Sequence, residues 1–460
     1  MLPRFAISCL VVLLALPAAA RTRPHYGGTL RVEIDGEPWA QNVTHRGGLG
    51  RRLVFDGLTS MDADGALRPS LALRWASENN DHRWQFWLRP GVHFHDGSVL
   101  TASVVQSALT GSCGAACPFA DVHAVGATLV FTSDSPMPNL PSLLAGDDFL
   151  IGLAGPVSSD PNAITGPSIG TGPFQVAGLS NGILTLDANA ACWQGRPFID
   201  KIEIHGYVPV RDQWLDLSVG RADLVEVPPE QLRQAQQQRL TVVSSRPAQL
   251  LALAVTDSGA LGNPNLRAAI ALAVDRGALS NVIFQKQSEI TASLLPSAFT
   301  GYAFIFSSDR DVNKAHELRG GLAPPPLTLT AEGGAVMQLA AQRIVLNLRE
   351  AGFNVQVAGN SAPQHADLAL VRLTLRSNQP QAALESLLRD AGVANPVLEN
   401  TPAGLYKIER EFLDTHTLIP LLYLPRAWAV SGRVRDLRLS SDGLPLLDGA
   451  SLQDSLEAAP

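Results

Sequence analysis

The sequence predicts an α/β protein, because segments with the period of strands alternate with segments with the period of helices along most of the chain. The chain has 460 residues, of which 46% are hydrophobic and 17% charged. This length predicts two or three domains, and this composition supports a large core and excludes intrinsic disorder. The formal net charge is −7 and no run of Lys or Arg occurs, which excludes a nucleic-acid-binding function and a polybasic membrane patch.

Several short segments have the pattern of strands. Apolar residues recur at every second position over residues 30–34, 84–88 and 202–204, which places their side chains on one face of a sheet. Residues 421–424 are apolar throughout, so we expect a strand that is buried on both faces. Residues 405–412 carry apolar side chains at helical spacing and predict a helix before that strand.

Two further helices have clear boundaries in the sequence. Asn263 and Pro264 suit the N-cap and first position of a helix, and residues 266–274 then place their apolar side chains on one face. Residues 337–348 repeat this pattern, and Gly352 supplies a suitable end. The apolar alternation that follows Gly352 predicts a strand, and therefore a helix-to-strand unit.

The N-terminus has the composition of a secretory signal peptide. Arg4 precedes an apolar stretch at residues 5–16, and three alanines follow at residues 18–20. The stretch is shorter than the roughly 20 residues that span a bilayer, and the alanines suit a cleavage site. We therefore expect residues 1–20 to be removed and the mature chain to be exported without a lipid anchor.

Cleavage would leave Cys113, Cys117 and Cys192. An oxidising compartment permits a disulfide bond, but an odd number leaves one thiol over. Cys113 and Cys117 could pair if they do not both lie on a helix, where this spacing gives poor geometry. Free buried thiols are the alternative, and the pairing stays open.

The pair His93 and His95 has two interpretations, a metal site and a structural turn. Two histidines at this spacing share one face of a strand, and Asp96 could add an oxygen ligand. The same residues also suit a strand that ends in a turn at Asp96-Gly97, which is the interpretation we favour. The sequence carries no phosphate-binding loop and no nucleophile motif. We therefore predict no metal, no cofactor and no catalytic residue.

A series of short motifs resembles one known family in both order and spacing. They are Gly27-Gly28-Thr29-Leu30, Phe55-Asp56-Gly57-Leu58, Arg68-Pro69-Ser70-Leu71-Ala72, residues 91–97, Gly170-Thr171-Gly172-Pro173-Phe174, residues 193–197, residues 265–270 and residues 419–423. They resemble the bacterial extracellular solute-binding proteins of family 5, the oligopeptide-, dipeptide- and nickel-binding proteins of ABC importers. The resemblance covers roughly residues 27–438.

The resemblance implies a two-lobed type II periplasmic binding protein fold with a hinge and a cleft between the lobes. Lobe I would comprise residues 21–246 and the returning residues 426–460, and lobe II residues 247–425, with the crossings near Pro247 and Pro425. It implies a monomer in the periplasm that binds a peptide or similar small solute by closure. A permease in the inner membrane would receive the solute, and the chain itself would not be an enzyme.

Two segments of the resemblance predict ligand contacts. Glu37 and Trp39 follow the first strand, where the family's turn opens toward the cleft, so Trp39 could stack on a ligand. A surface or hinge-packing role for Trp39 is the alternative. Thr171 and Gly172 lie in a loop whose backbone N–H groups could hold an anion. That loop could equally be a tight turn at the edge of the cleft.

A third set suggests an acidic solute. Arg372, Thr374 and Arg376 alternate along an expected strand and would share a face, where two guanidinium groups could bind a carboxylate. A solvated sheet face is the alternative. In the family this region carries a Trp and an acidic residue that receives a ligand ammonium, and residues 371–376 have neither.

These departures leave two alternative functions. One is a scaffold or interaction protein that keeps the fold and has lost its transport ligand. The other, which we favour less, is a secreted metal-dependent enzyme built on His93 and His95.

Overall fold

The fold is α/β, as predicted. The computed structural model describes residues 25–39, 48–113, 117, 119–155, 167–322, 324–331, 333–358, 366–393, 396, 398–399 and 401–453. The expected signal peptide lies outside these residues. No helix among them is long and apolar enough to cross a membrane.

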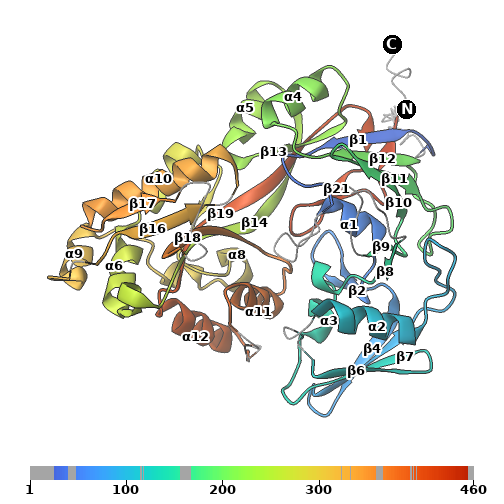
Figure 1. The fold of residues 1–460 in the computed structure, drawn as a ribbon, viewed down its shortest axis with the longest axis horizontal. Coiled ribbons are helices and arrows are strands. Elements are labelled where there is room, and N and C mark those ends of the chain that lie inside the picture. Colours follow the sequence, from blue (N-terminus) through green and yellow to red (C-terminus); the bar gives the residue numbers. More distant parts are fainter. Residues whose placement is uncertain are drawn as a thin grey trace, which may run out of the picture.

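One large sheet connects the two lobes (Figure 1). Among the described residues it has eleven strands in the order β10-β11-β12-β1-β13-β19-β14-β18-β16-β17, and β15 pairs with β19. The strands are β1 (Thr29–Glu33), β10 (Phe174–Ser180), β11 (Ile183–Ala188), β12 (Lys201–His205), β13 (Leu224–Val227), β14 (Thr241–Val255), β15 (Glu289–Ile290), β16 (Leu327–Ala331), β17 (Val355–Val357), β18 (Leu368–Thr374) and β19 (Leu418–Val430).

The two long strands β14 and β19 run antiparallel through both lobes and join them (Figure 1). Their register shifts between Ser244 and Gln249, and Pro247 lies opposite Pro425 within this stretch. Because proline cannot donate a ladder hydrogen bond, paired prolines weaken the ladder locally. The two residues that we expected near the crossings are therefore Cα partners at an irregular point of the connecting strands.

The described residues of the first lobe form three hydrophobic cores. One lies around β1, β11 and β12 and helix α1 (Leu49–Val54). A second lies between β13, β19, α4 (Val210–Ser218) and α5 (Leu232–Gln237). The third belongs to a four-stranded sheet in the order β4-β5-β7-β6, against which α2 (Ala102–Cys113) packs, and α3 (Leu140–Leu143) contributes Leu140 to the same core. The strands of this sheet are β4 (Ala72–Glu78), β5 (Arg83–Leu88), β6 (Asp121–Val125) and β7 (Thr128–Thr132). The single first lobe that we predicted therefore includes a distinct subdomain.

Short elements complete the first lobe. They are β2 (Thr59–Met61), β3 (Leu67–Pro69), η3 (Asp147–Phe149), β8 (Leu153–Ala154), β9 (Pro167–Ile169), α4 (Val210–Ser218), η4 (Pro229–Gln231), α5 (Leu232–Gln237), β20 (Val434–Arg435), β21 (Arg438–Leu439), β22 (Pro445–Leu446) and β23 (Ser451–Leu452).

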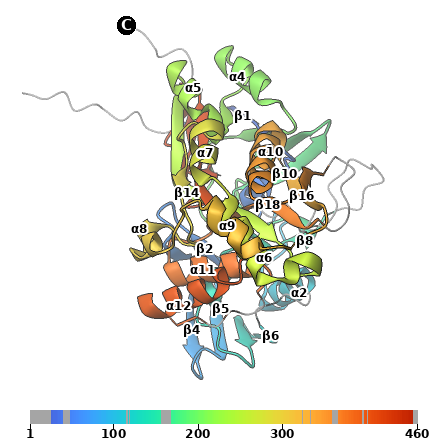
Figure 2. The ribbon, with the colours of Figure 1, turned by 90° about the vertical axis from the view of Figure 1, so that its left-hand side faces the viewer.

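The second lobe has helices on both faces of the sheet. Leu251 and Leu253 of β14 belong to the core that α6 and α10 cover, whereas Leu250 and Ala252 face the core of α11 and α12. Figure 2 shows α11 and α12 together, away from α10. The elements are η5 (Gly259–Gly262), α6 (Pro264–Ala273), α7 (Arg276–Ala278), η6 (Leu279–Ile283), α8 (Ser297–Thr300), η7 (Ala303–Ile305), α9 (Val312–Arg319), α10 (Gly334–Glu350), α11 (Pro380–Asp390) and α12 (Pro402–Leu413).

The predicted helices of this lobe are confirmed. The Asn263 side chain accepts a hydrogen bond from the backbone N–H of Asn265 and caps α6. Helix α10 buries Met337, Ile344 and Leu348 on one face. Gly352 follows it with a φ of 85°, a value that favours glycine.

The structure assigns two of the cysteines. Cys117 is disulfide-bonded, and Cys192 is a free, buried thiol. Cys113 is the last residue of α2, so Cys117 lies beyond the helix. The thiol left over by the odd count is therefore Cys192.

Candidate functional site

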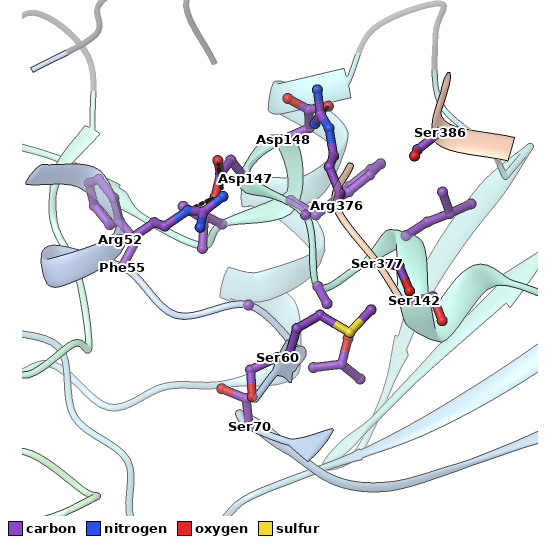
Figure 3. Close-up of a pocket in the computed structure, with 18 of the residues that line it drawn as sticks. Arg52, Phe55, Ser60, Ser70, Ser142, Asp147, Asp148, Arg376, Ser377 and Ser386 are labelled. Atoms are coloured by element: carbon purple, nitrogen blue, oxygen red, sulfur yellow. Dashed lines mark hydrogen bonds and ion pairs between the residues drawn. The ribbon is translucent and has the colours of Figure 1, made fainter. Parts of the chain in front are cut away.

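A cavity of about 1110 Å³ lies between the lobes. Its walls come from segments that are far apart in the sequence: α1 and β2, the residues around η3, the start and end of α11, and the turn between β21 and β22. Figure 3 shows Arg52 and Asp147 on one side and Arg376, Ser377 and Ser386 on the other. The charged lining residues are Arg51, Arg52, Arg376, Arg389, Asp56, Asp147, Asp148, Asp390 and Asp442, and the serines are Ser60, Ser70, Ser107, Ser142, Ser377, Ser386, Ser440 and Ser441.

Arg52 joins three segments of the first lobe. Its Nε and Nη2 atoms donate to both carboxylate oxygens of Asp147 at 2.7 and 2.9 Å, and Nη1 donates to Asp442 Oδ1 at 3.0 Å. Burial alone would raise the pKa of Asp442, but the charge and hydrogen bonds of Arg52 lower it well below its usual value. Arg52 therefore fixes one wall of the cavity.

Direct contacts hold the two lobes together beside the cavity. Arg376, two residues after β18, lies 3.5 Å from Asp148 of the first lobe and 3.2 Å from Asp390 of α11. Asn139 of the first lobe donates from Nδ2 to Glu385 Oε2 of α11 at 2.6 Å. Both side chains of this hydrogen bond are buried, and burial raises the pKa of Glu385. These contacts join the two lobes directly.

Asp56 lines the cavity, and hydrogen bonds from two side chains fix its carboxylate. Its Oδ2 atom accepts hydrogen bonds from Thr171 Oγ1 at 2.8 Å and Trp193 Nε1 at 2.9 Å. Burial raises the pKa of Asp56, and these two hydrogen bonds oppose the shift. Thr171 is fully buried, so it supports the cavity wall from outside the cavity.

The loop at Gly170–Gly172 is a tight, closely packed turn. Two of its N–H groups are already used: Gly172 donates to Val54 O at 3.0 Å, and Gly170 donates to His95 Nδ1 at 3.2 Å. A Cβ atom at Gly170 would lie 1.9 Å from Val54 O, so only glycine fits. The geometry therefore agrees with the turn that we weighed against an anion cradle.

Glu37 and Trp39 do not line this cavity. Trp39 is only 2% exposed and packs against Phe55, with ring centroids 5.7 Å apart. Glu37 is half-buried. Trp39 therefore packs in the core of the first lobe, and it lies neither on the surface nor in the wall of this cavity.

Arg372 and Arg376 have different neighbours in the structure. Strand β18 ends at Thr374, but the alternation continues, because the Leu375 N–H donates to Ala248 O and Leu375 packs in the same core as Leu373. Arg372 lies in the electrostatic environment of Glu226, Glu230 and Arg426, and desolvation lowers its pKa. Neither Arg372 nor Thr374 lines the cavity. Of the three residues in this set, Arg376 is the one that reaches the cavity.

The histidines of the 91–97 segment bind backbone atoms. His95 accepts from the Gly170 N–H at Nδ1, and its Nε2 lies 3.1 Å from Gly172 O. His93 Nδ1 lies 3.1 Å from Gly91 O. Asp96 accepts from the N–H and hydroxyl of Ser98 in the expected turn. No group of three or more potential ligand side chains is found in the described part of the chain.

Most residues of the cavity wall carry no signal in the local sequence. One ion-pair cluster of the wall contains Arg52, Asp147 and Asp442. Asp147 is 95 residues and Asp442 390 residues from Arg52 in the sequence, so no local pattern predicts that they meet. Asp56 is an exception, because it belongs to the family motif Phe55-Asp56-Gly57-Leu58. The motif alone does not indicate that its carboxylate lines the cavity.

The comparisons with known proteins agree with this architecture. The sequence profile described as "Bacterial extracellular solute-binding proteins, family 5 Middle" matches residues 66–395. The probable di/tripeptide-binding protein 5 of Pseudomonas aeruginosa is 25% identical over 410 residues, which cover 77% of this chain and 76% of that protein. The PBP AgaA from A. tumefaciens R10, solved with agropinic acid, superposes with a TM-score of 0.78 at 19% identity, over 93% of this chain and 99% of that chain.

One relative is of another kind. The HTH-type transcriptional regulator SgrR of Pectobacterium atrosepticum is 33% identical over 158 residues, which are 33% of this chain. The matched region spans only 28% of the length of that regulator. The family profile, in contrast, matches well over half of the chain and extends across both lobes. The chain therefore belongs to the bacterial extracellular solute-binding proteins, family 5.

Proposed function

We propose that this chain is the solute-binding component of an ABC importer, and that it captures a peptide or similar small solute between its lobes for delivery to a permease in the inner membrane. The observation that carries the proposal is the cavity of about 1110 Å³ with walls from both lobes. Sites for small molecules usually have about 300–1,000 Å³, so the cavity has room for a short peptide or a solute of similar size.

Capture would work by closure. The contacts of Arg376 with Asp148 and of Asn139 with Glu385 join the lobes, and they would break when the lobes separate. A solute that touches both walls adds favourable contacts to the closed form only, and it shifts the population toward that form. The permease would then recognise the closed, loaded protein.

The cavity lining suits a polar solute. Its serine hydroxyls both donate and accept hydrogen bonds, so they can satisfy amide or hydroxyl groups of many solutes. The names of two similar proteins, a probable di/tripeptide-binding protein and a protein solved with agropinic acid, support peptides or compact acidic solutes. We place the protein in the periplasm as a monomer without enzymatic activity, on the strength of its N-terminal sequence and its family.

Thermal unfolding of residues 21–460 against di- to pentapeptides, oligosaccharides and organic acids tests the proposal. A solute that binds only the folded protein stabilises it by about 2.7 kcal/mol at 100 times its dissociation constant. We expect one solute class to raise the midpoint, and calorimetry to give one site per chain.

Two variants connect the shift to the cavity. Ser386→Tyr places a bulky ring at the cavity wall and should abolish the shift, whereas Ser103→Tyr on the exposed side of α2 should preserve it. Flat curves for folded wild-type protein free of co-purified solute would instead support the scaffold alternative.

A further inference from the structure

Most charged groups of the cavity are already paired within the protein. Arg52 binds Asp147 and Asp442, and Arg376 lies between Asp148 and Asp390. Arg389 of α11 binds Glu385 at 2.9 Å. A solute could use these side chains only in competition with a partner that is already in place. In the second lobe, the groups that remain for a solute are therefore chiefly serine hydroxyls, because the arginines there are already ion-paired.

Arg51 is different. It lines the cavity from α1 and is half-buried, and its guanidinium lies 5.9 Å from the ring centroid of Phe55. Within the described residues, no carboxylate oxygen lies within 4.0 Å of its nitrogens, in contrast to the neighbouring Arg52. A guanidinium without a carboxylate partner in a confined site attracts an anionic group, which it can bind through two parallel hydrogen bonds.

Asp56 complements Arg51. Thr171 and Trp193 both donate to its Oδ2 atom, and no donor to Oδ1 is found in the described part of the chain. Trp193 is itself fixed, because the guanidinium of Arg89 stacks on its ring at 4.4 Å. Asp56 is thus a rigid acceptor with one oxygen still available to a donor in the cavity.

We propose that Arg51 and Asp56 form the recognition pair of the cavity. This inference rests on the proposed function and specifies its solute class: a compact solute with a carboxylate or similar anionic group for Arg51, and a hydroxyl or N–H donor for Asp56. Both residues lie in or directly after α1, so the first lobe selects the solute. The second lobe then closes over it with hydroxyls and paired charges.

Calorimetric titration with matched probes tests this pair. The probes are alanyl-alanine and its C-terminal amide, and gluconate and glucose. In wild-type protein we expect each acid to bind at least tenfold more tightly than its uncharged counterpart. Arg51→Gln should abolish that preference, and Arg51→Lys, which retains the charge, should restore part of it.

Asp56→Asn tests the second half of the pair. Asparagine keeps the shape and one oxygen, so it should weaken binding of all donor-bearing probes at least tenfold while the preference for acids remains. Thermal unfolding without solute checks that each variant is folded.

The outcomes separate this inference from the proposed function. If acids and their uncharged counterparts bind wild-type protein equally, or if Arg51→Gln leaves the preference intact, the recognition pair is wrong and the solute-binding function stands. If neither the four probes nor any solute of the wider panel binds folded wild-type protein, both are overturned.

Discussion

His95 supports the Gly170–Gly172 turn through both of its ring nitrogens. Nδ1 accepts the Gly170 N–H, so the ring proton resides on Nε2, where it is donated to Gly172 O. A second proton could only go to Nδ1 and would break the bond to Gly170. Burial also lowers the pKa of His95, which means that the folded state binds this proton less readily than the unfolded state.

We therefore expect His95 to make the protein less stable in acid. Above pH 6.5 the ring is neutral in both states, and its hydrogen bonds contribute fully. As the pH falls below that value, the unfolded state takes up the proton first and stability is lost until the folded pKa is reached. Urea unfolding at pH 7.5 and pH 5.0 should show a smaller loss for His95→Gln than for wild type. His93→Gln, at an exposed position, should behave as wild type; equal losses in all three proteins would contradict the assignment.

Glu33 has the opposite pH dependence. It is 4% exposed at the end of β1, and its Oε2 atom is buried with no hydrogen-bond partner among the described residues. Burial, reinforced by Asp216, raises its pKa to about 7. The carboxyl therefore stays neutral in the folded protein while the unfolded state ionises above its ordinary pKa, so stability is lost as the pH rises from about 4.5 to 7.

Glu33→Gln should remove this loss. The variant should be more stable than wild type at pH 8, by up to about 3 kcal/mol if the whole pKa shift is realised, and similar to it at pH 4.5. Urea unfolding at the two pH values measures the difference. Glu317→Gln on the exposed face of α9 is the control, and a destabilised Glu33→Gln at pH 8 would show that the carboxylate has a partner in solution.

Single residues show where sequence patterns stop being informative. Arg372 and Arg376 are expected on one face because they alternate with Thr374, and Leu373 and Leu375 both pack into one core on the other face. Arg376 lines the cavity and Arg372 does not, because four residues of extended chain place their side chains about 13 Å apart. Which stretch of a strand borders a cavity depends on the elements that pack beside it, which the local sequence does not specify.

Elements were predictable because their signals are local. A cap, a first-turn proline, a terminal glycine and an apolar face all lie within one helix, and α6 and α10 have them. The same reasoning gives a quantitative expectation for the N-cap of α6, which packs into the core of the second lobe.

Asn263→Ala should destabilise the protein by about 1 kcal/mol, because the N–H of Asn265 loses the side-chain oxygen that it donates to at 2.9 Å. Asn263→Ser retains a capping oxygen and should cost only a few tenths of a kcal/mol. Urea unfolding of both variants measures the difference. Equal losses would mean that packing of residue 263, and not capping, accounts for the effect.

At the scale of the whole molecule, the cavity depends on which distant segments meet. Residues near 52, 147, 376 and 442 line it together, and their proximity comes from the sheet order and from closure of the lobes. Neither is encoded in a short pattern. The family motifs predicted the two lobes, but they did not indicate which side chains face the cavity.

Closure itself can be tested at Asn139. This residue stands at the N-cap position of α3 yet makes no capping hydrogen bond; its side chain reaches across to Glu385 of α11 instead. A hydrogen bond to a charged group contributes about 1.5–3 kcal/mol, so Asn139→Ala should shift the equilibrium toward the open form by roughly tenfold or more. Small-angle scattering without solute should show a larger radius of gyration than for wild type.

The same variant should bind its solute more weakly, because affinity falls in proportion to the population of the closed form. Saturating solute should restore the compact form, since contacts with both walls still favour it. Glu411→Gln on the exposed side of α12 should change neither property. If Asn139→Ala scatters and binds as wild type does, the hydrogen bond is a consequence of closure and makes no net contribution to it, and Arg376 with Asp148 becomes the contact that holds the lobes together.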